Sequence, residues 1–144
     1  MKEDYKVNVR NHNGGLRSVL EDGQGHFLGI CDVLFCNLER ADDGKYANRH
    51  LHLRGVQVTD INFLQPLVAL TLAEIPTKRL KPINELLISQ TQLCAHGRMV
   101  WNGIIVARLK AIIDEVFKNN GKPKYKLENN FGYKGFQLYV DFRA

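Results

Sequence analysis

The segment that most constrains the fold is residues 99–119, MVWNGIIVARLKAIIDEVFKN. At 100° per residue its charged side chains fall on one face of a helix, and its apolar side chains gather on the other. The apolar face comprises Trp101, Ile105, Val106, Leu109, Ile112, Ile113, Val116 and Phe117. This face is wider than a coiled-coil seam, so we expect an amphipathic helix that lies across a sheet and supplies the centre of the core.

A competing signal lies at the start of this segment. Asn102-Gly103 is the residue pair most typical of a two-residue hairpin turn. If it formed such a turn, residues 99–101 would be a short strand and the helix would begin near Gly103. The sequence leaves both starting points open.

Strand periodicity dominates the first 58 residues and the last 20. Residues 5–9 and 16–20 flank an Asn- and Gly-rich turn, and residues 26–38 and 46–53 flank the turn signal at 41–44. Residues 125–127 and 136–142 alternate in the same way and predict a terminal hairpin. We therefore expect antiparallel hairpins at both ends of the chain.

The middle of the chain is harder to assign. Residues 66–76 are apolar and lie between two prolines, which fits a short helix or a buried strand, and we favour the helix. Residues 82–94 place apolar side chains at helical spacing, with Glu85 in the first turn, and predict a second helix. The expected fold is thus α+β: an antiparallel sheet of hairpins packed against one long amphipathic helix, about 99–119, with one or two shorter helices.

Composition indicates an ordinary globular chain. With 144 residues, 44% hydrophobic and 24% charged, the sequence fits a single compact domain over 1–144. Three cysteines give no disulfide framework, and neither a secretory leader nor a transmembrane segment is evident. We therefore expect a cytoplasmic or nuclear protein that is not secreted, with peripheral membrane contact as the only kind of contact with a bilayer.

Positive charge is concentrated near the C-terminus. The chain carries a net charge of +5, and residues 118–144 hold six Lys or Arg against two Asp or Glu, a local excess of four. Alternating lysines on a strand lie about 6.6 Å apart, close to the phosphate repeat of a nucleic acid, although lysines also protect sheet edges against aggregation. The nucleic-acid-binding candidates are Lys122, Lys124, Tyr125, Lys126, Phe131, Tyr133 and Lys134, extended by Lys78, Arg79 and Lys81.

His50-Leu51-His52 is the sharpest short motif. Two histidines two residues apart on a strand share a face and can hold one divalent metal, which resembles the paired histidines of HUH-type DNA nickases and replication proteins. That resemblance implies a metal-dependent nuclease. It covers three residues only, and all five tyrosines lie in predicted strands or loops rather than on the helix where such enzymes carry their nucleophile.

The cysteines suggest core positions. Cys31 and Cys36 are separated by an odd number of residues, so a regular strand sends them to opposite faces and they cannot share a metal. Cys94 stands two residues before His96, but neighbours in sequence do not make a catalytic geometry. We expect no cofactor, and no phosphate-binding glycine loop is present.

These patterns favour a binding protein over an enzyme. The leading hypothesis is non-enzymatic binding of RNA or single-stranded DNA through the basic, aromatic-containing C-terminal surface, with little sequence specificity. The first alternative is a self-associating structural or adaptor protein of viral matrix type, which contacts membrane or nucleoprotein and uses the small-residue stripe Gly103, Ala107 and Ala111. The second alternative is the metal-dependent nuclease centred on His50 and His52.

Overall fold

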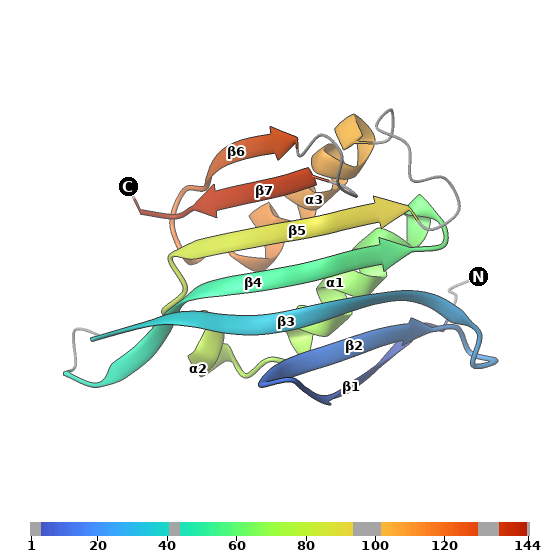
Figure 1. Ribbon diagram of the computed structural model, residues 1–144, viewed down its shortest axis with the longest axis horizontal. Coiled ribbons are helices and arrows are strands. Elements are labelled where there is room, and N and C mark those ends of the chain that lie inside the picture. The colour runs from blue at the N-terminus through green and yellow to red at the C-terminus, as the bar shows by residue number, and fades with distance from the viewer. Residues whose placement is uncertain (1–3, 41–43, 94–101, 130–135, 144) are drawn as a thin grey trace.

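The computed structural model describes residues 4–40, 44–93, 102–129 and 136–143, and one continuous seven-stranded sheet organises them (Figure 1). The strand order is β1-β2-β3-β4-β5-β7-β6. The strands are β1 (Lys6–His12), β2 (Gly15–Glu21), β3 (Phe27–Arg40), β4 (Tyr46–Val58), β5 (Glu85–Leu93), β6 (Lys124–Asn129) and β7 (Phe136–Asp141). The helices are η1 (Ile61–Phe63), α1 (Leu64–Ala73), α2 (Thr77–Leu80) and α3 (Asn102–Val116).

The first four strands form an antiparallel meander. Asn13 (φ +48°) and Gly14 (φ +82°) make the turn between β1 and β2, where both residues must adopt the left-handed region. The predicted hairpins at 5–20 and 26–53 are confirmed, and β3 and β4 extend further along the chain than predicted.

The centre of the sheet corrects the predicted fold class. Residues 82–94 do not form a helix; β5 occupies Glu85–Leu93 and runs parallel to β4. The sheet is therefore mixed, and the prediction of a purely antiparallel sheet of hairpins is wrong. A parallel pair requires a crossover, which η1, α1 and α2 supply between β4 and β5. The helix favoured for 66–76 is confirmed as α1.

One face of the sheet carries the helices and the core (Figure 1). The helix predicted over 99–119 is α3, which spans Asn102–Val116 and is shorter than predicted. The sheet is therefore covered by several short helices rather than by one long helix. The apolar face of α3 is buried as predicted: Leu109 and Ile113 are 0% exposed and Phe117 is 1% exposed. Trp101 lies outside the described residues. Buried leucines and isoleucines of β4 and β5 face these helices, which leaves the alternate side chains of the same strands on the opposite, open face.

No helix in the described stretches is long and apolar enough to cross a membrane. The single-domain assignment over 1–144 and the cytoplasmic or nuclear location stay predictions.

Candidate functional site

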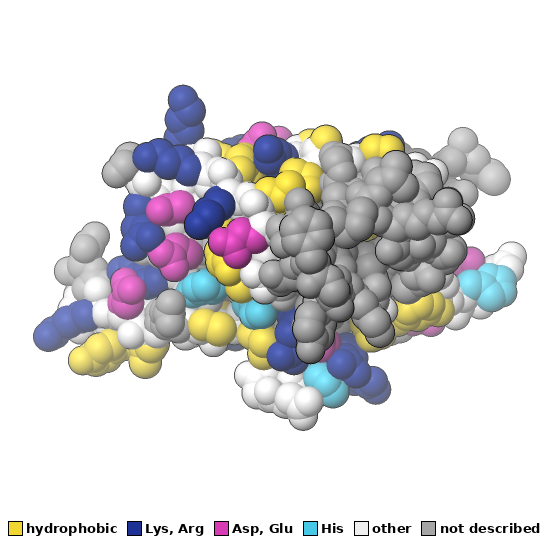
Figure 2. Space-filling view, turned by 45° about the horizontal axis from the view of Figure 1, so that its top comes forward, with side chains coloured by type: hydrophobic (Ala, Val, Ile, Leu, Met, Phe, Trp, Pro, Cys, Tyr) yellow, Lys and Arg dark blue, Asp and Glu magenta, His cyan; other side chains and the backbone are white. Residues whose placement is uncertain are grey.

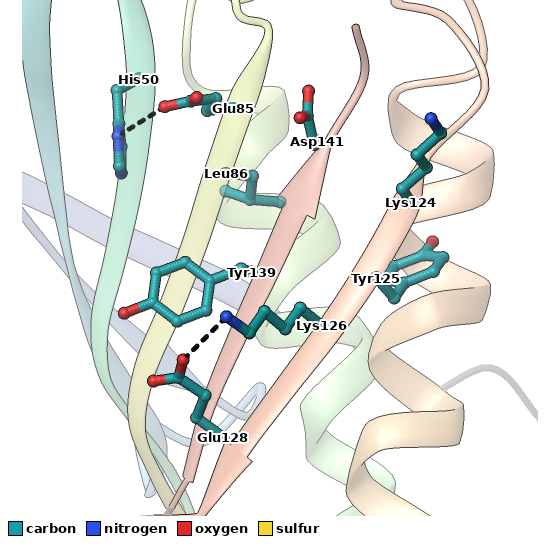
Figure 3. A pocket seen from close by; sticks show the side chains of 9 residues that line it. All are labelled: His50, Glu85, Leu86, Lys124, Tyr125, Lys126, Glu128, Tyr139 and Asp141. Atoms are coloured by element: carbon teal, nitrogen blue, oxygen red, sulfur yellow. Dashed lines mark ion pairs between the residues drawn. The ribbon is translucent and has the colours of Figure 1, made fainter. Parts of the chain in front are cut away.

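The open face of the sheet carries ionisable side chains in register across five strands. Successive cross-strand partners project from the same face and lie side by side. Following the pairing from β3 through β4, β5 and β7 to β6 gives one such line, which we term the transverse row: Cys36, His50, Glu85, Asp141 and Lys124. Figure 3 shows four of its members around one groove, with His50 turned toward Glu85.

His50 is the centre of the transverse row. Its Nδ1 lies 3.4 Å from Glu85 Oε2, and its side chain is 19% exposed. Nδ1 is fully buried and makes no hydrogen bond within the described structure. A nearby carboxylate favours the tautomer that carries the proton on Nδ1, which leaves Nε2 as the basic nitrogen. The other oxygen of Glu85 contacts Arg143, which is also 3.0 Å from Asp141 through its Nε.

His52, two residues along the same strand, has a different environment. Its Nε2 lies 2.6 Å from the hydroxyl of Ser89, which is 3% exposed. Burial, together with the nearby His50 and Arg54, lowers the pKa of His52 to about 4. His52 is therefore neutral near pH 7, and its ring is held by a buried partner on β5.

Beyond His52, the open face of the sheet carries a cluster of ion pairs. Arg17 donates from Nε and Nη2 to the two oxygens of Asp32 at 2.8 and 3.1 Å, and Arg54 approaches the same carboxylate at 3.9 Å. The hydrogen bonds from Arg17 hold the pKa of Asp32 below its ordinary value, despite the opposing effect of partial burial. This two-pronged geometry fixes Asp32 between two cations.

A groove of about 520 Å³ opens on the other side of His50. Its lining is dominated by side chains of both charges: it comprises His50, Glu85, Leu86, Lys124, Tyr125, Lys126, Glu128, Tyr139 and Asp141. Figure 2 shows the same mixture on the surface, where basic and acidic side chains intersperse beside histidine. The volume falls within the usual range for small-molecule sites.

The predicted basic surface is only partly present. Lys124 and Lys126 do project from β6 into the groove, but Lys126 Nζ lies 3.3 Å from Glu128, and Lys124 stands opposite Asp141. Tyr125 points to the helix side, where its hydroxyl donates to Asp114 at 2.5 Å. Its ring is therefore engaged with α3 and is not free to stack on a base.

The remaining predicted cations do not extend this surface. Lys78 and Arg79 belong to α2, on the helix side of the sheet, and the Arg79 guanidinium sits 3.7 Å over the ring of Phe35 on β3. Lys81 directly follows α2, and Lys122 precedes β6, the strand at the far edge (Figure 1). Phe131, Tyr133 and Lys134 lie outside the described residues.

Sequence reasoning missed most of the transverse row. Glu85 was assigned to a helix, and Cys36 was assigned to the core although it is only half-buried. Asp141 was placed on a terminal strand without a partner. The sequence signal at β5 was weak: the polar Glu85 and Ser89 alternate with the apolar Leu86 and Ile88, which are buried in the structure, but Leu87 interrupts the pattern.

The sequence matches no protein-family model and no curated protein. Among solved structures it is similar to the N-terminal domain of a ribosomal-protein-alanine acetyltransferase from Clostridium acetobutylicum (TM-score 0.41, 10% identity, covering 94% of this chain and 96% of that one). It is also similar to TofI in a ternary complex with an inhibitor and MTA (0.45, 12%, 94% and 70%). A third is a GNAT-family acetyltransferase from Staphylococcus aureus (0.41, 14%, 90% and 69%).

The structure corrects the predicted function, and nothing in its described residues supports the expected RNA-binding, viral or homo-oligomeric character. The physical reason for abandoning nucleic-acid binding is that Lys124 and Lys126 share their groove with Glu85, Glu128 and Asp141, which would repel phosphate. The alternative of a self-associating, viral matrix-like adaptor is withdrawn for the same lack of support.

The metal-dependent nuclease is also corrected. His50 and His52 do share a face, as predicted, but His52 Nε2 is engaged by Ser89. Within the described ranges, no three His, Cys, Asp or Glu side chains are placed together to hold a metal ion. The two histidines therefore have different partners: His50 lies beside Glu85, and His52 is bonded to Ser89.

Proposed function

We propose that the groove binds a small zwitterionic molecule and that His50 acts there as a general base in a group-transfer reaction at the ligand's amine or hydroxyl. The observation that carries this proposal is the His50–Glu85 pair: a buried Nδ1 that lies 3.4 Å from a carboxylate at the wall of a groove and has no hydrogen-bond partner among the described residues. A base oriented by a third group is the arrangement that proton abstraction requires.

The charge pattern of the groove sets the ligand class. Lys124 and Lys126, the latter paired with Glu128, line the β6 side (Figure 3). Glu85 on β5 and Asp141 on β7, which both contact Arg143, carry carboxylates on the side nearer His50. An anionic group of the ligand would lie against the lysines and a cationic amine against the carboxylates. A ligand of a single charge would gain from one side and be repelled by the other.

The arrangement also gives each group a chemical role. The Nε2 atom of His50 accepts the proton of the attacking amine or hydroxyl, and Glu85 stabilises the imidazolium that forms. Tyr139 lines the same groove, and its hydroxyl donates to Gln137 Oε1 at 3.1 Å. That hydroxyl can turn to donate to a developing negative charge on the acceptor.

A binding assay tests the proposal directly. We expect a free amino acid to bind more tightly than its amide or its decarboxylated amine, measured by ligand-observed NMR or calorimetry. Asp141→Asn and Lys126→Gln each weaken binding about tenfold, because one ion-pair partner is lost. Lys118→Gln provides the matched control, since this exposed lysine pairs with Glu115 away from the groove.

The histidine resonances supply an independent readout. Ligand addition should shift the ring signals of His50 and leave those of His52 nearly unchanged. Equal binding of the amino acid and its singly charged analogues, or unaltered binding in both groove variants, would remove the proposed site.

A further inference from the structure

We propose that Arg143 is an exchangeable counter-ion of the groove: in the free protein its guanidinium occupies the carboxylates of Glu85 and Asp141, and the ammonium group of the ligand takes its place there. This inference rests on the proposed function, because it concerns the same groove. It adds the subsite that receives the ligand's cation and the residue that must leave before that cation binds.

The Arg143 guanidinium bridges two side chains that the sheet places next to each other. Asp141 on β7 is the direct antiparallel partner of Glu85 on β5. Figure 3 shows both carboxylates between His50 and Lys124. Arg143 donates to Asp141 from its backbone N at 2.8 Å, from Nε at 3.0 Å and from Nη2 at 3.3 Å, and Nη2 also contacts Glu85. One guanidinium therefore binds both carboxylates, with a two-pronged geometry on Asp141.

Each carboxylate that lines the groove already has a basic partner, so an entering ammonium group must compete for it. The pairs are Glu128–Lys126, Asp141–Arg143, Glu85–Arg143 and Glu85–His50. Arg143 is shared by two of these carboxylates, and it does not itself line the groove. Its departure therefore frees both carboxylates on the His50 side and leaves the lining of the groove in place.

The exposure of these ion pairs allows the exchange. The side chain of Arg143 is 56% exposed, and those of Asp141 and Glu85 are 42% and 31% exposed. Ion pairs at such positions contribute little to stability, because water competes for both partners. The departing guanidinium returns to water while the ligand's ammonium group replaces it, so no charge is left unpaired. A ligand without a cation cannot compensate the two carboxylates in this way.

The ion pair at the other end of the open face has the same two-pronged geometry but a different exposure. Arg17 also donates from Nε and Nη2 to the two oxygens of one carboxylate, that of Asp32. The side chains of this pair are only 29% and 14% exposed, and Arg54 supplies a second cation. Releasing Arg17 would leave a mostly buried carboxylate short of a partner, which is costly. We therefore assign the exchange to Arg143 and not to Arg17.

Calorimetry with L-alanine tests the competition. Arg143→Gln should raise the affinity for L-alanine about fivefold, the upper end of what an exposed ion pair contributes, because the internal competitor is lost. Arg143→Lys keeps the charge but not the two-pronged bond, so its affinity should fall between wild type and Arg143→Gln. Arg10→Gln is the matched control: it removes the same charge from β1, at the opposite edge of the sheet from β6, and should change the affinity by less than about twofold.

NMR of the arginine side chains reports the displacement directly. The ¹⁵Nε signal of Arg143 is assigned by its absence from Arg143→Gln. L-Alanine should shift this signal toward that of free arginine, whereas propionate, which lacks the ammonium group, should leave it in place. The Nε signal of Arg17 is the internal control and should respond to neither ligand. An Arg143 signal that responds equally to both ligands would contradict exchange with a cation.

A double variant tests whether Arg143 acts through the carboxylate that it contacts. In the Asp141→Asn background, Arg143→Gln should raise the affinity for L-alanine by less than about twofold, because the guanidinium has already lost its main partner. A full fivefold gain in that background would mean that Arg143 acts only through the net charge of the protein, which would overturn the inference.

The failure of this inference is distinguishable from the failure of the proposed function. If L-alanine binds to the wild-type protein but binds equally or more weakly to Arg143→Gln, or leaves the Arg143 Nε signal unmoved, the exchange is overturned and the proposed function stands. If L-alanine binds to neither protein, the proposed function is removed and the inference with it.

Discussion

The two ends of the open sheet face differ in how completely their polar atoms are paired. At the His52 end, the imidazole is bonded to Ser89, and Asp32 is held between Arg17 and Arg54. At the His50 end, a buried ring nitrogen makes no hydrogen bond to any residue that the structure describes, and a groove opens beside it. Saturated polar networks rigidify a fold, while unsaturated groups at a concave surface are available to a ligand. We therefore infer that the His52 end stabilises the fold and that the His50 end binds a ligand.

The largest expected contrast comes from the two carboxylates. Asp32→Asn should lower the free energy of unfolding by about 2 kcal/mol, because it removes charge-assisted hydrogen bonds from a mostly buried side chain. Glu85→Gln should change it by less than about 1 kcal/mol, since the Arg143 partner is exposed. Urea titrations at pH 7 measure both changes, and equal losses of unfolding free energy would refute the assignment of different roles to the two ends.

The same Asp32 variant has a pH signature. Arg17 lowers the pKa of Asp32 in the folded state, so the stability that this carboxylate contributes is present above its unfolded pKa of about 3.9 and is lost as the pH falls through the lower folded value. The gap between wild type and Asp32→Asn should close on acidification below about pH 4. A gap that persists in acid would mean that the ion pairs are not its cause.

An intermediate effect on the free energy of unfolding is expected from the protonation of His52. Its pKa is lowered to about 4 in the folded state, so between pH 6.5 and 4 the unfolded chain binds a proton that the folded chain does not. Stability should therefore fall as the pH drops through this window, by an amount on the order of 1 kcal/mol after discounting for solvent screening. His52→Gln should flatten that slope. NMR titration that finds His52 protonated at pH 6 would contradict this account.

The smallest effect on stability is expected in the groove. Lys126 and Glu128 form an exposed pair, with side chains 74% and 42% exposed, so Lys126→Gln should alter the free energy of unfolding by less than about 0.5 kcal/mol. Thermal unfolding measures this change. A larger loss would show that the lysine supports the fold rather than a ligand, and would weaken the contrast with the His52 end.

The sequence alone predicted those helices and strands whose signals lie within the element itself. The core face of α3 was correct because its apolar period persists over several turns, and the first hairpin was correct because Asn13 and Gly14 suit a tight turn. The error at β5 arose because Ile83, Leu86, Leu87 and Gln90 fit a helical period as well as a strand. Parallel pairing with β4 is a tertiary contact that local periodicity does not report.

The wrong assignment of β5 is also the reason why the sequence did not predict the candidate site. The shared face of His50 and His52 followed from strand alternation and is confirmed. Their partners, Glu85 and Ser89, stand on β5 and could be found only after residues 85–93 were recognised as a strand. The neighbour relation between Cys36 and His50 depended on the register of a long hairpin, which the turn signal at 41–44 did not specify closely enough.

The parallel junction between β4 and β5 has a consequence for how the site comes into being. Cys36 and His50 belong to the meander of the first half of the chain, while Glu85, Asp141 and Lys124 come from the second half. Local hairpins can form early, but a parallel pair closes only after its long crossover is ordered, which delays it during folding. The complete transverse row should therefore be absent from a partly folded chain, and the groove should form only after the last strands have joined β5.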